Sequence, residues 1–162
     1  MNATILGVGE LGATATAGTS IRTYALGSCV GVVVLHPGKR AVGMAHIALA
    51  DSSTNAAKAK TAPGYFADTG VEALLDAMTA LGCPPRGKGL VVKLAGGAKI
   101  LDLADSFDIG KKNLLAVKKA LWKFGLAPRS EDVGGTISRT LEVCVDSGRV
   151  TVTSATRETW EI

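Results

Sequence analysis

Short apolar runs interrupted by glycine dominate the first fifty residues. Runs rich in Val, Ile, Leu and Thr predict β-strands over residues 3–8, 21–26, 30–36 and 42–49. The Pro37-Gly38 pair between the last two runs is typical of a tight turn, because proline and glycine preset turn dihedral angles. We therefore expect a hairpin, in which the start of one strand lies opposite the end of the other.

Two later segments have the spacing of amphipathic helices. The first begins near Thr69 and Glu72, which have the form of a capping box, and ends at Gly82. Its apolar stripe consists of Val71, Leu74, Leu75, Met78 and Leu81. The second covers about residues 109–124 and stops at Gly125. Its inward residues are expected to be Leu114, Val117, Leu121 and Phe124.

The rest of the chain completes an α+β pattern. Residues 51–62 are small, polar and unpatterned, which predicts an exposed loop. Further strands are predicted over residues 89–94, 137–145 and 149–154. Asp146-Ser147-Gly148 has the form of a hairpin turn between the last two. We expect a single domain over residues 1–162, with mostly antiparallel strands and two main helices.

The composition is that of an ordinary globular protein. Hydrophobic residues make up 47% and aromatic residues only 4%, so the core must be built from Val, Leu, Ile and Ala. The net charge of +4 favours acidic partners, but no basic stretch is interleaved with aromatic residues as in nucleic-acid binding. No secretory signal pattern and no apolar run of about 18 residues occurs, so we expect a cytoplasmic protein without membrane insertion.

The few cysteines and histidines limit the chemistry. Three cysteines at wide spacing form neither a disulfide framework nor a C-x-x-C pair, so at least one free thiol is expected. Together with two histidines they never fall at metal-ligand spacing. The paired glycines do not match phosphate-binding motifs. We therefore expect neither a metal nor a bound nucleotide.

Cys29 lies in a setting that favours reactivity. A tight glycine turn presents its thiol at the start of an apolar strand and leaves the backbone N–H groups near Ser28 and Cys29 free to bind an oxyanion. The alternative is a buried structural cysteine, which is the commoner role for this residue type. Cys83 and Cys144 lack this setting and are expected to be structural.

His46 and Thr23 complete a candidate site. The expected hairpin pairs His46 with Cys29, and a thiol of pKa about 8.5 needs a neighbouring base to become a thiolate at neutral pH. The Thr23 hydroxyl can orient the imidazole, as Asn or Asp does in other cysteine hydrolases. The alternatives are a core histidine and an ordinary β-branched strand residue. The other histidine, His36, lies at the turn and is expected at the surface.

Five lysines on the second predicted helix form the best candidate for a partner-binding surface. They are Lys111, Lys112, Lys118, Lys119 and Lys123. Of these, Lys118 and Lys119 are the candidate contacts with an acidic partner. The alternative is a solvated helix face, which is the commoner role of such residues.

Five segments, in order along nearly the whole chain, resemble the CheD family of chemoreceptor glutamine deamidases from bacterial and archaeal chemotaxis. The first, T-Y-A-L-G-S-C-V-G, contains Thr23 and Cys29, and the second, G-M-A-H-I-A-L, contains His46. The other three are residues 95–98, 109–113 and 132–139. The chain departs from the family at Ala50, where proline is usual, and at Ser138, where glycine is usual. These departures bear on loop shape and substrate fit more than on chemistry.

The resemblance implies both a mechanism and a fold. It implies Cys29 as nucleophile, His46 as base, Thr23 as the third member of the site, and backbone N–H groups at Ser28 and Cys29 for the oxyanion. The implied reaction converts a glutamine of a methyl-accepting chemotaxis receptor to glutamate through a thioester, which also allows hydrolysis of receptor methyl esters. No cofactor is implied. The implied fold is an α/β sandwich similar to the cytotoxic necrotizing factor deamidases.

A docking module is the alternative function. CheD-like proteins pair with CheC-type phosphatases of the phosphorylated response regulator, and a member can keep that role while deamidating little. The presence of Thr23, Cys29 and His46 together favours the enzyme, because a docking protein has no need of all three.

Overall fold

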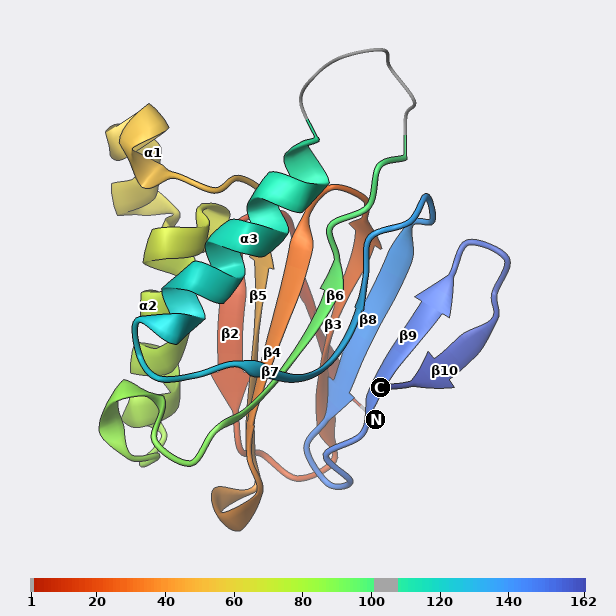
Figure 1. Cartoon of the computed structure of the whole chain (residues 1–162). Coiled ribbons are helices and arrows are strands. Elements are labelled where there is room, and N and C mark those ends of the chain that lie inside the picture. Colours follow the sequence, from red (N-terminus) through yellow and green to blue (C-terminus); the bar gives the residue numbers. More distant parts are fainter. Residues whose placement is uncertain (1, 101–107) are drawn as a thin grey trace.

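Two five-stranded sheets make up the frame of the molecule (Figure 1). The computed structural model describes residues 2–100 and 108–162. The first sheet contains, in spatial order, β1 (Asn2–Leu6), β3 (Thr19–Leu26), β8 (Arg139–Cys144), β9 (Val150–Ser154) and β10 (Thr159–Glu161). The second contains β2 (Leu11–Thr14), β5 (Ala41–Ile47), β4 (Val30–His36), β6 (Val91–Gly96) and β7 (Pro128–Val133). The expected antiparallel character is confirmed, since among the described strands only β1–β3 and β6–β7 pair in parallel.

In the described residues, the helices cover the second sheet and not the first. The two main helices, α2 (Ala67–Ala80) and α3 (Ile109–Trp122), pack against the outer face of this sheet, and the short α1 (Ala56–Thr61) precedes them (Figure 1). The other face of the second sheet packs on the first sheet. The mixed α and β architecture with two main helices is thereby confirmed, in three layers. Within the described residues, no helix has the length and apolar character needed to cross a membrane.

Alternate residues of each central strand enter different cores, as the two-residue period of a strand requires. On β4, Val30, Val32 and Val34 face the helices, whereas Val33 and Leu35 face the first sheet. Each such side chain contributes roughly 1.5–3 kcal/mol when fully buried. Both cores consist almost entirely of Val, Leu, Ile, Ala and Met, as the scarcity of aromatic residues predicts.

The predicted hairpin is confirmed. Strands β4 and β5 pair antiparallel from Val30 opposite Ile47 to His36 opposite Ala41. A 3₁₀ turn over Pro37–Lys39 joins them. The His36 imidazole accepts a hydrogen bond from the Lys39 N–H at 3.2 Å, so this half-buried histidine caps the turn instead of standing fully exposed. The second expected hairpin, β8 to β9 through Gly148, is also present.

Three strands escape the sequence pattern. They are β2, β7 and β10, and each lies at the edge of its sheet. An edge strand has one neighbour and only partly buried side chains, so its sequence shows no apolar run. Periodicity alone therefore finds the central strands and one edge strand, β1, but misses the other three edge strands.

The loop expected over residues 51–62 is wrong in part. The segment is largely exposed, but it forms a 3₁₀ turn over Ser52–Asn55 and then α1. The Asn55 side chain caps α1 by accepting from the Lys58 N–H at 3.1 Å. The alanines that follow Asn55 favour a helix even without an apolar stripe.

The capping box at Thr69 is also wrong. Helix α2 begins two residues earlier, at Ala67, and has no side-chain cap. The Thr69 hydroxyl instead donates to the Pro63 carbonyl at 2.6 Å. The end of the helix is as predicted, because Gly82 adopts a φ of 97° directly after the last turn. Leu81 is 39% exposed and so does not belong to the buried stripe.

Candidate active site

The hairpin register brings Cys29 and His46 to the same end of the second sheet. Gly31 lies opposite His46, and Val30 lies opposite Ile47. Continuing this register by one residue puts Cys29 diagonal to His46. Diagonal neighbours on one face of an antiparallel pair lie about 7–8 Å apart, which is within reach of long side chains.

The three candidate side chains enter the layer between the two sheets. His46 shares the inner face of β5 with Met44, and Thr23 shares the inner face of β3 with Ile21. Cys29 is half-buried and packs against the same core. Residues from two sheets that the sequence could not place relative to each other therefore meet in one layer.

Main-chain hydrogen bonds hold the turn that carries Cys29. The Gly97 N–H donates to the Cys29 carbonyl and the Ala98 N–H donates to the Gly27 carbonyl, both at 2.8 Å. Gly96 allows this close approach, since it has a φ of 105° and a Cβ there would lie 2.2 Å from the Cys29 oxygen. The residues at the end of β6 and directly after it thus hold the Cys29 turn in place through main-chain hydrogen bonds.

The strand before the turn is irregular. Ala25 has a φ of 57°, a left-handed conformation that is uncommon for alanine, and the β3–β8 pairing shifts register between Thr23 and Leu26. Such backbone conformations cost about 1–3 kcal/mol each and cluster at functional sites. The irregularity lies between Thr23 and Cys29, where it sets the path from one to the other.

The hydrogen bonds of Thr23 fix the tautomer of His46. The Thr23 hydroxyl donates its single proton to the Leu6 carbonyl at 2.8 Å, because a carbonyl can only accept. The 2.6 Å contact between Thr23 Oγ1 and His46 Nδ1 must then be donated by Nδ1–H. In the neutral imidazole this leaves Nε2 with a lone pair, the form that a general base requires.

Burial keeps the resting pair neutral. His46 is 1% exposed, and its Nε2 has no hydrogen-bond partner among the described residues. Desolvation lowers the pKa of His46 below its ordinary value of 6.5. Desolvation also raises the pKa of Cys29 above 9.0, an effect that its own backbone N–H partly offsets. Both shifts favour the neutral forms near neutral pH, a thiol at Cys29 and an uncharged imidazole at His46.

The amides at the turn are available as donors. Neither the Ser28 nor the Cys29 N–H donates to a backbone carbonyl in the described part of the chain. The chemistry of such a turn matches an oxyanion hole, in which backbone N–H groups face the developing negative charge.

Asn113 ties α3 to both halves of the site. Its side-chain Nδ2 donates to the Ser28 carbonyl at 3.0 Å and to the Ala48 carbonyl at 2.9 Å. Ser28 immediately precedes Cys29 in the chain, and Ala48 follows His46 by two residues. Asn113 is 1% exposed, so these bonds are made away from water and hold the Cys29 turn at a fixed position relative to the His46 strand.

A buried ion pair joins the two sheets next to this end. Arg139 is 4% exposed and donates to Asp132 at 3.1 Å, and its Nη1 donates to the Gly134 carbonyl at 3.0 Å. The Trp160 indole N–H donates to the other Asp132 oxygen. The contacts link β7 of the second sheet to β8 and β10 of the first.

Comparisons with known proteins give the family of the chain. A family model described as CheD chemotactic sensory transduction matches residues 48–154. The chain belongs to the CheD family. A relative from Syntrophotalea carbinolica, named probable chemoreceptor glutamine deamidase CheD, is 51% identical over 162 residues and the match covers 100% of both chains. A relative of the same description from Anaeromyxobacter dehalogenans is 43% identical over 95% of this chain and 96% of its own. One from the archaeon Methanococcus maripaludis is 42% identical over 90% of each chain.

The CheD-family match and the candidate side chains cover different parts of the chain. The matched span begins two residues after His46, so it contains Asn113 and Arg139 but not Thr23 or Cys29. The relative from Syntrophotalea carbinolica, in contrast, aligns with the complete chain. The resemblance to CheD proteins inferred from the sequence is confirmed by both findings.

The other two cysteines and the two candidate lysines lie away from the turn that carries Cys29. Cys83 is buried, as expected, and none of the three cysteines forms a disulfide. Burial raises the pKa of both Cys83 and Cys144.

Lys118 and Lys119 lie on the outward side of α3, where Lys118 forms an ion pair with Glu131 at 3.0 Å. In the described residues no three His, Cys, Asp or Glu side chains gather as a metal site.

Asn113 is the functional candidate that the sequence reasoning missed. It occupies the buried stripe of α3 together with Gly110, Val117 and Leu121. A polar side chain in an apolar stripe needs a buried partner, because an unpaired amide costs free energy there. The sequence shows that Asn113 interrupts an apolar stripe, but it does not show which carbonyl groups the side chain binds.

Proposed function

We propose that this chain is a chemoreceptor glutamine deamidase, which converts specific glutamine side chains of methyl-accepting receptors to glutamate. Its relatives bear that name, and the chain belongs to their family. The observation that carries the proposal is the orientation of His46, whose Nδ1–H is held by Thr23 and whose Nε2 remains unpaired in the layer that Cys29 enters.

The proposed first half-reaction forms a thioester. His46 Nε2 takes the Cys29 thiol proton, and the sulfur attacks the side-chain amide carbon of glutamine, forming a C–S bond. The N–H groups of Ser28 and Cys29 donate hydrogen bonds to the developing oxyanion. The imidazolium then returns the proton to the amide nitrogen, the C–N bond breaks, and ammonia leaves.

The proposed second half-reaction consumes one water. His46 takes a proton from the water, the oxygen attacks the thioester, and the C–S bond breaks to give glutamate and the Cys29 thiolate, which recovers its proton. A methyl ester of a receptor glutamate would give the same thioester with methanol as the leaving group. We therefore include receptor methyl esters as a second substrate class. The proposed steps use side chains and water only.

The proposal extends to the setting of the enzyme. Residues 1–162 act as one deamidase domain in the cytoplasm, where thiols stay reduced. A relation to the cytotoxic necrotizing factor deamidases stays a proposal that superposition of the two folds can test. A docking module for a CheC-type phosphatase stays the alternative function.

Mass spectrometry tests the proposal directly. Incubation with the cytoplasmic domain of a methyl-accepting receptor should add about one dalton per converted glutamine, and Cys29→Ala should abolish the gain. Cys144→Ala is the matched control, because Cys144 is a half-buried thiol away from His46, and it should convert receptor at the normal rate. Deamidation by Cys29→Ala at the normal rate would contradict the assignment of the nucleophile.

A further inference from the structure

The outward face of α3 presents two large apolar side chains to solvent. Trp122 is 79% exposed and Leu115 is 59% exposed, and no other large hydrophobic residue in the described part of the chain is more exposed than these. They are seven residues apart, so they lie two turns apart on one face of the helix. We call these two residues the α3 ridge. A folded protein rarely leaves an exposed tryptophan beside an exposed leucine without use.

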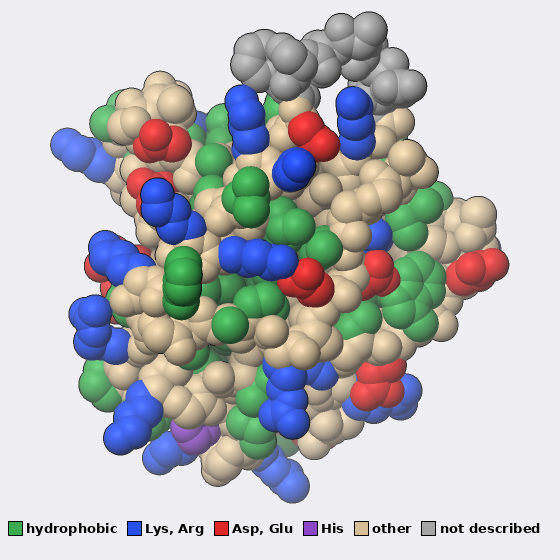
Figure 2. Space-filling model, viewed as in Figure 1, with side chains coloured by type: hydrophobic (Ala, Val, Ile, Leu, Met, Phe, Trp, Pro, Cys, Tyr) green, Lys and Arg blue, Asp and Glu red, His purple; other side chains and the backbone are tan. Residues whose placement is uncertain are grey.

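Lysines border the α3 ridge on both sides. By helical geometry Lys111 and Lys118 fall on one side, and Lys112, Lys119 and Lys123 on the other. Helix α3 contains no Asp or Glu. Figure 2 shows hydrophobic side chains on this face with Lys and Arg around them.

Carboxylates near the α3 ridge compensate only part of this charge. Glu131 pairs with Lys118. Asp51, Asp68 and Glu72 line an adjoining groove with Lys119 and Lys123, but in the described residues none of the three forms an ion pair with either lysine. Among the described residues, the five lysines therefore exceed these four carboxylates by one charge, and the lysines of α3 itself lie nearest the apolar centre.

A groove runs beside the α3 ridge. It has a volume of about 600 Å³, and its far wall is the segment Leu126, Ala127 and Pro128, which leads from the end of α3 into β7. A concave apolar groove next to an exposed tryptophan is the geometry that accepts the apolar side chains of a partner helix. Tryptophan is also among the residues that most often dominate binding energy.

We propose that the α3 ridge and its groove dock an amphipathic helix of a partner protein that carries acidic residues on both sides of its apolar stripe. The apolar stripe fills the groove against Trp122, and the carboxylates face the lysines. This goes beyond the proposed deamidase function, since Asn113 and the Cys29 turn lie on the opposite, inward side of the helix.

Two other occupants fit the face less well. A second copy of this chain, related by a two-fold axis, would bring the same lysines against each other, which like-charge repulsion opposes. A bilayer surface attracts lysines and tryptophan, but it is flat and has no side chains to fill the groove.

The test uses a designed helical peptide of about eighteen residues with a leucine stripe and glutamates on both sides of it. In ¹⁵N NMR, the indole N–H signal of Trp122 should shift on titration, while that of Trp160, which is engaged with Asp132, should not. A peptide with every glutamate replaced by lysine should produce no shift. Added salt should weaken the binding of the acidic peptide.

Variants identify the surface. Trp122→Ala should weaken peptide binding about tenfold or more, and Trp122→Phe should restore most of it. The Trp122 side chain is exposed, so neither substitution should affect the fold. Ile5→Ala removes a 49% exposed apolar side chain from β1 and is the matched control, with unchanged affinity expected. Lys119→Glu should weaken binding, whereas Lys60→Glu on α1 should not.

Each contrary result overturns the proposal. Equal peptide affinity in wild type and Trp122→Ala, or no shift of the Trp122 signal at millimolar peptide, removes the α3 ridge as a docking site. Binding to vesicles of phosphatidylcholine and phosphatidylglycerol without peptide binding assigns the face to a membrane. Self-association that Trp122→Ala abolishes assigns it to a second copy of this chain. Deamidation at Cys29 is measured in a separate assay, so failure of the docking proposal does not bear on the deamidase proposal.

Discussion

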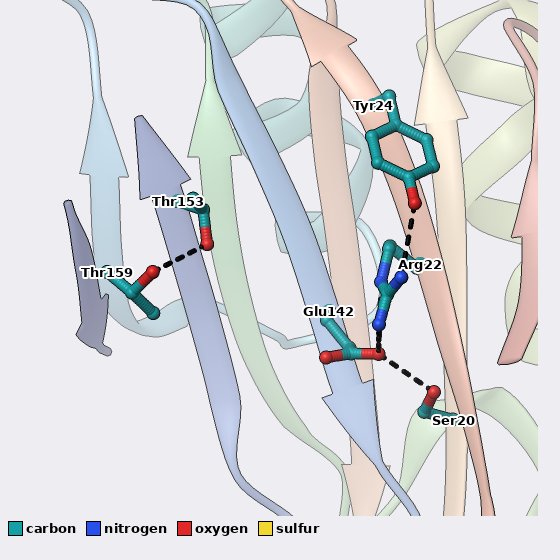
Figure 3. A network of polar contacts seen from close by, with 6 residues as sticks. All are labelled: Ser20, Arg22, Tyr24, Glu142, Thr153 and Thr159. Atoms are coloured by element: carbon teal, nitrogen blue, oxygen red, sulfur yellow. Dashed lines mark hydrogen bonds and ion pairs between the residues drawn. The ribbon is translucent and has the colours of Figure 1, made fainter. Parts of the chain in front are cut away.

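The two faces of strand β3 use polar side chains in opposite ways. On the inner face, Thr23 is fully buried and contacts His46 at 2.6 Å. On the outer face, Arg22 bonds to Glu142 at the same distance, 2.6 Å, and to the Tyr24 hydroxyl at 3.1 Å (Figure 3). Neighbouring residues of one strand therefore make contacts of equal length in different surroundings.

Burial, not distance, decides what such a contact is worth. A buried polar group that loses its partner costs about 1–3 kcal/mol, because no water replaces the partner. An exposed ion pair contributes about 0–1 kcal/mol, since water and salt screen it and two long side chains must be ordered. Substitutions on the inner face of β3 should thus change turnover and stability, whereas substitutions on the outer face should change both only slightly.

Among the hydrogen bonds that support the site, the largest effect is expected from those of Asn113, a second buried polar side chain. Asn113→Ala leaves the Ser28 and Ala48 carbonyls without their donor, so we expect a loss of about 1–3 kcal/mol in unfolding free energy. The deamidation rate should fall further than the folded fraction does, because the Cys29 turn is no longer fixed relative to the His46 strand. Thermal unfolding and initial rates on receptor measure the two effects.

Val117→Ala is the matched control for Asn113→Ala. Val117 is buried on the same face of α3 and belongs to the apolar core, so its truncation should lower stability and leave the rate per folded molecule unchanged. Asn113→Asp keeps the size of the side chain but cannot donate to either carbonyl. Normal turnover in Asn113→Asp would show that Asn113 only fills space.

The second prediction concerns Thr23. Thr23→Val keeps the shape but removes the donor to Leu6 and the acceptor for His46 Nδ1–H, so the imidazole loses its orientation. We expect turnover to slow about three- to tenfold, the effect of one neutral hydrogen bond. Thr23→Ser keeps the hydroxyl and should retain most activity. If Thr23→Val turns over receptor as fast as wild type at equal melting temperature, the site reduces to Cys29 and His46.

The sequence predicts the hairpin that pairs Cys29 with His46, because both strands are apolar and Pro37-Gly38 marks the turn between them. The sequence also suggests that Thr23 contacts His46, but it does not show the bond from Thr23 to the Leu6 carbonyl that sets the direction of this contact. The Leu6 carbonyl reaches Thr23 through the parallel pairing of β1 with β3, and pairing between strands is a tertiary property. The two carbonyls bound by Asn113 lie 85 and 65 residues away in the chain, so no local pattern could identify them.

The third prediction is a pH dependence of stability that follows from His46. Burial lowers the pKa of His46 in the folded state, so the unfolded chain binds more protons below pH 6.5. Stability is therefore fully present above 6.5 and falls as the pH drops below that value. The loss between pH 6.5 and pH 5 should shrink in His46→Gln, as melting temperatures across this range would show. An unchanged slope in His46→Gln would mean that His46 is not the group responsible.

The smallest effect is expected on the outer face of β3. Glu142→Gln keeps the size and an acceptor oxygen for Ser20, which donates to Glu142 at 2.9 Å, but removes the charge opposite Arg22. The two side chains are 35% and 22% exposed, so the ion pair should contribute no more than about 1 kcal/mol, and high salt should reduce that further. Deamidation should be unchanged, because Glu142 bonds to Ser20 and Arg22 on the outer face of the sheet. The informative comparison is with Thr23→Val on the same strand, measured in the same buffer. A stability loss in Glu142→Gln equal to that of Thr23→Val would mean that contact geometry outweighs burial on this strand.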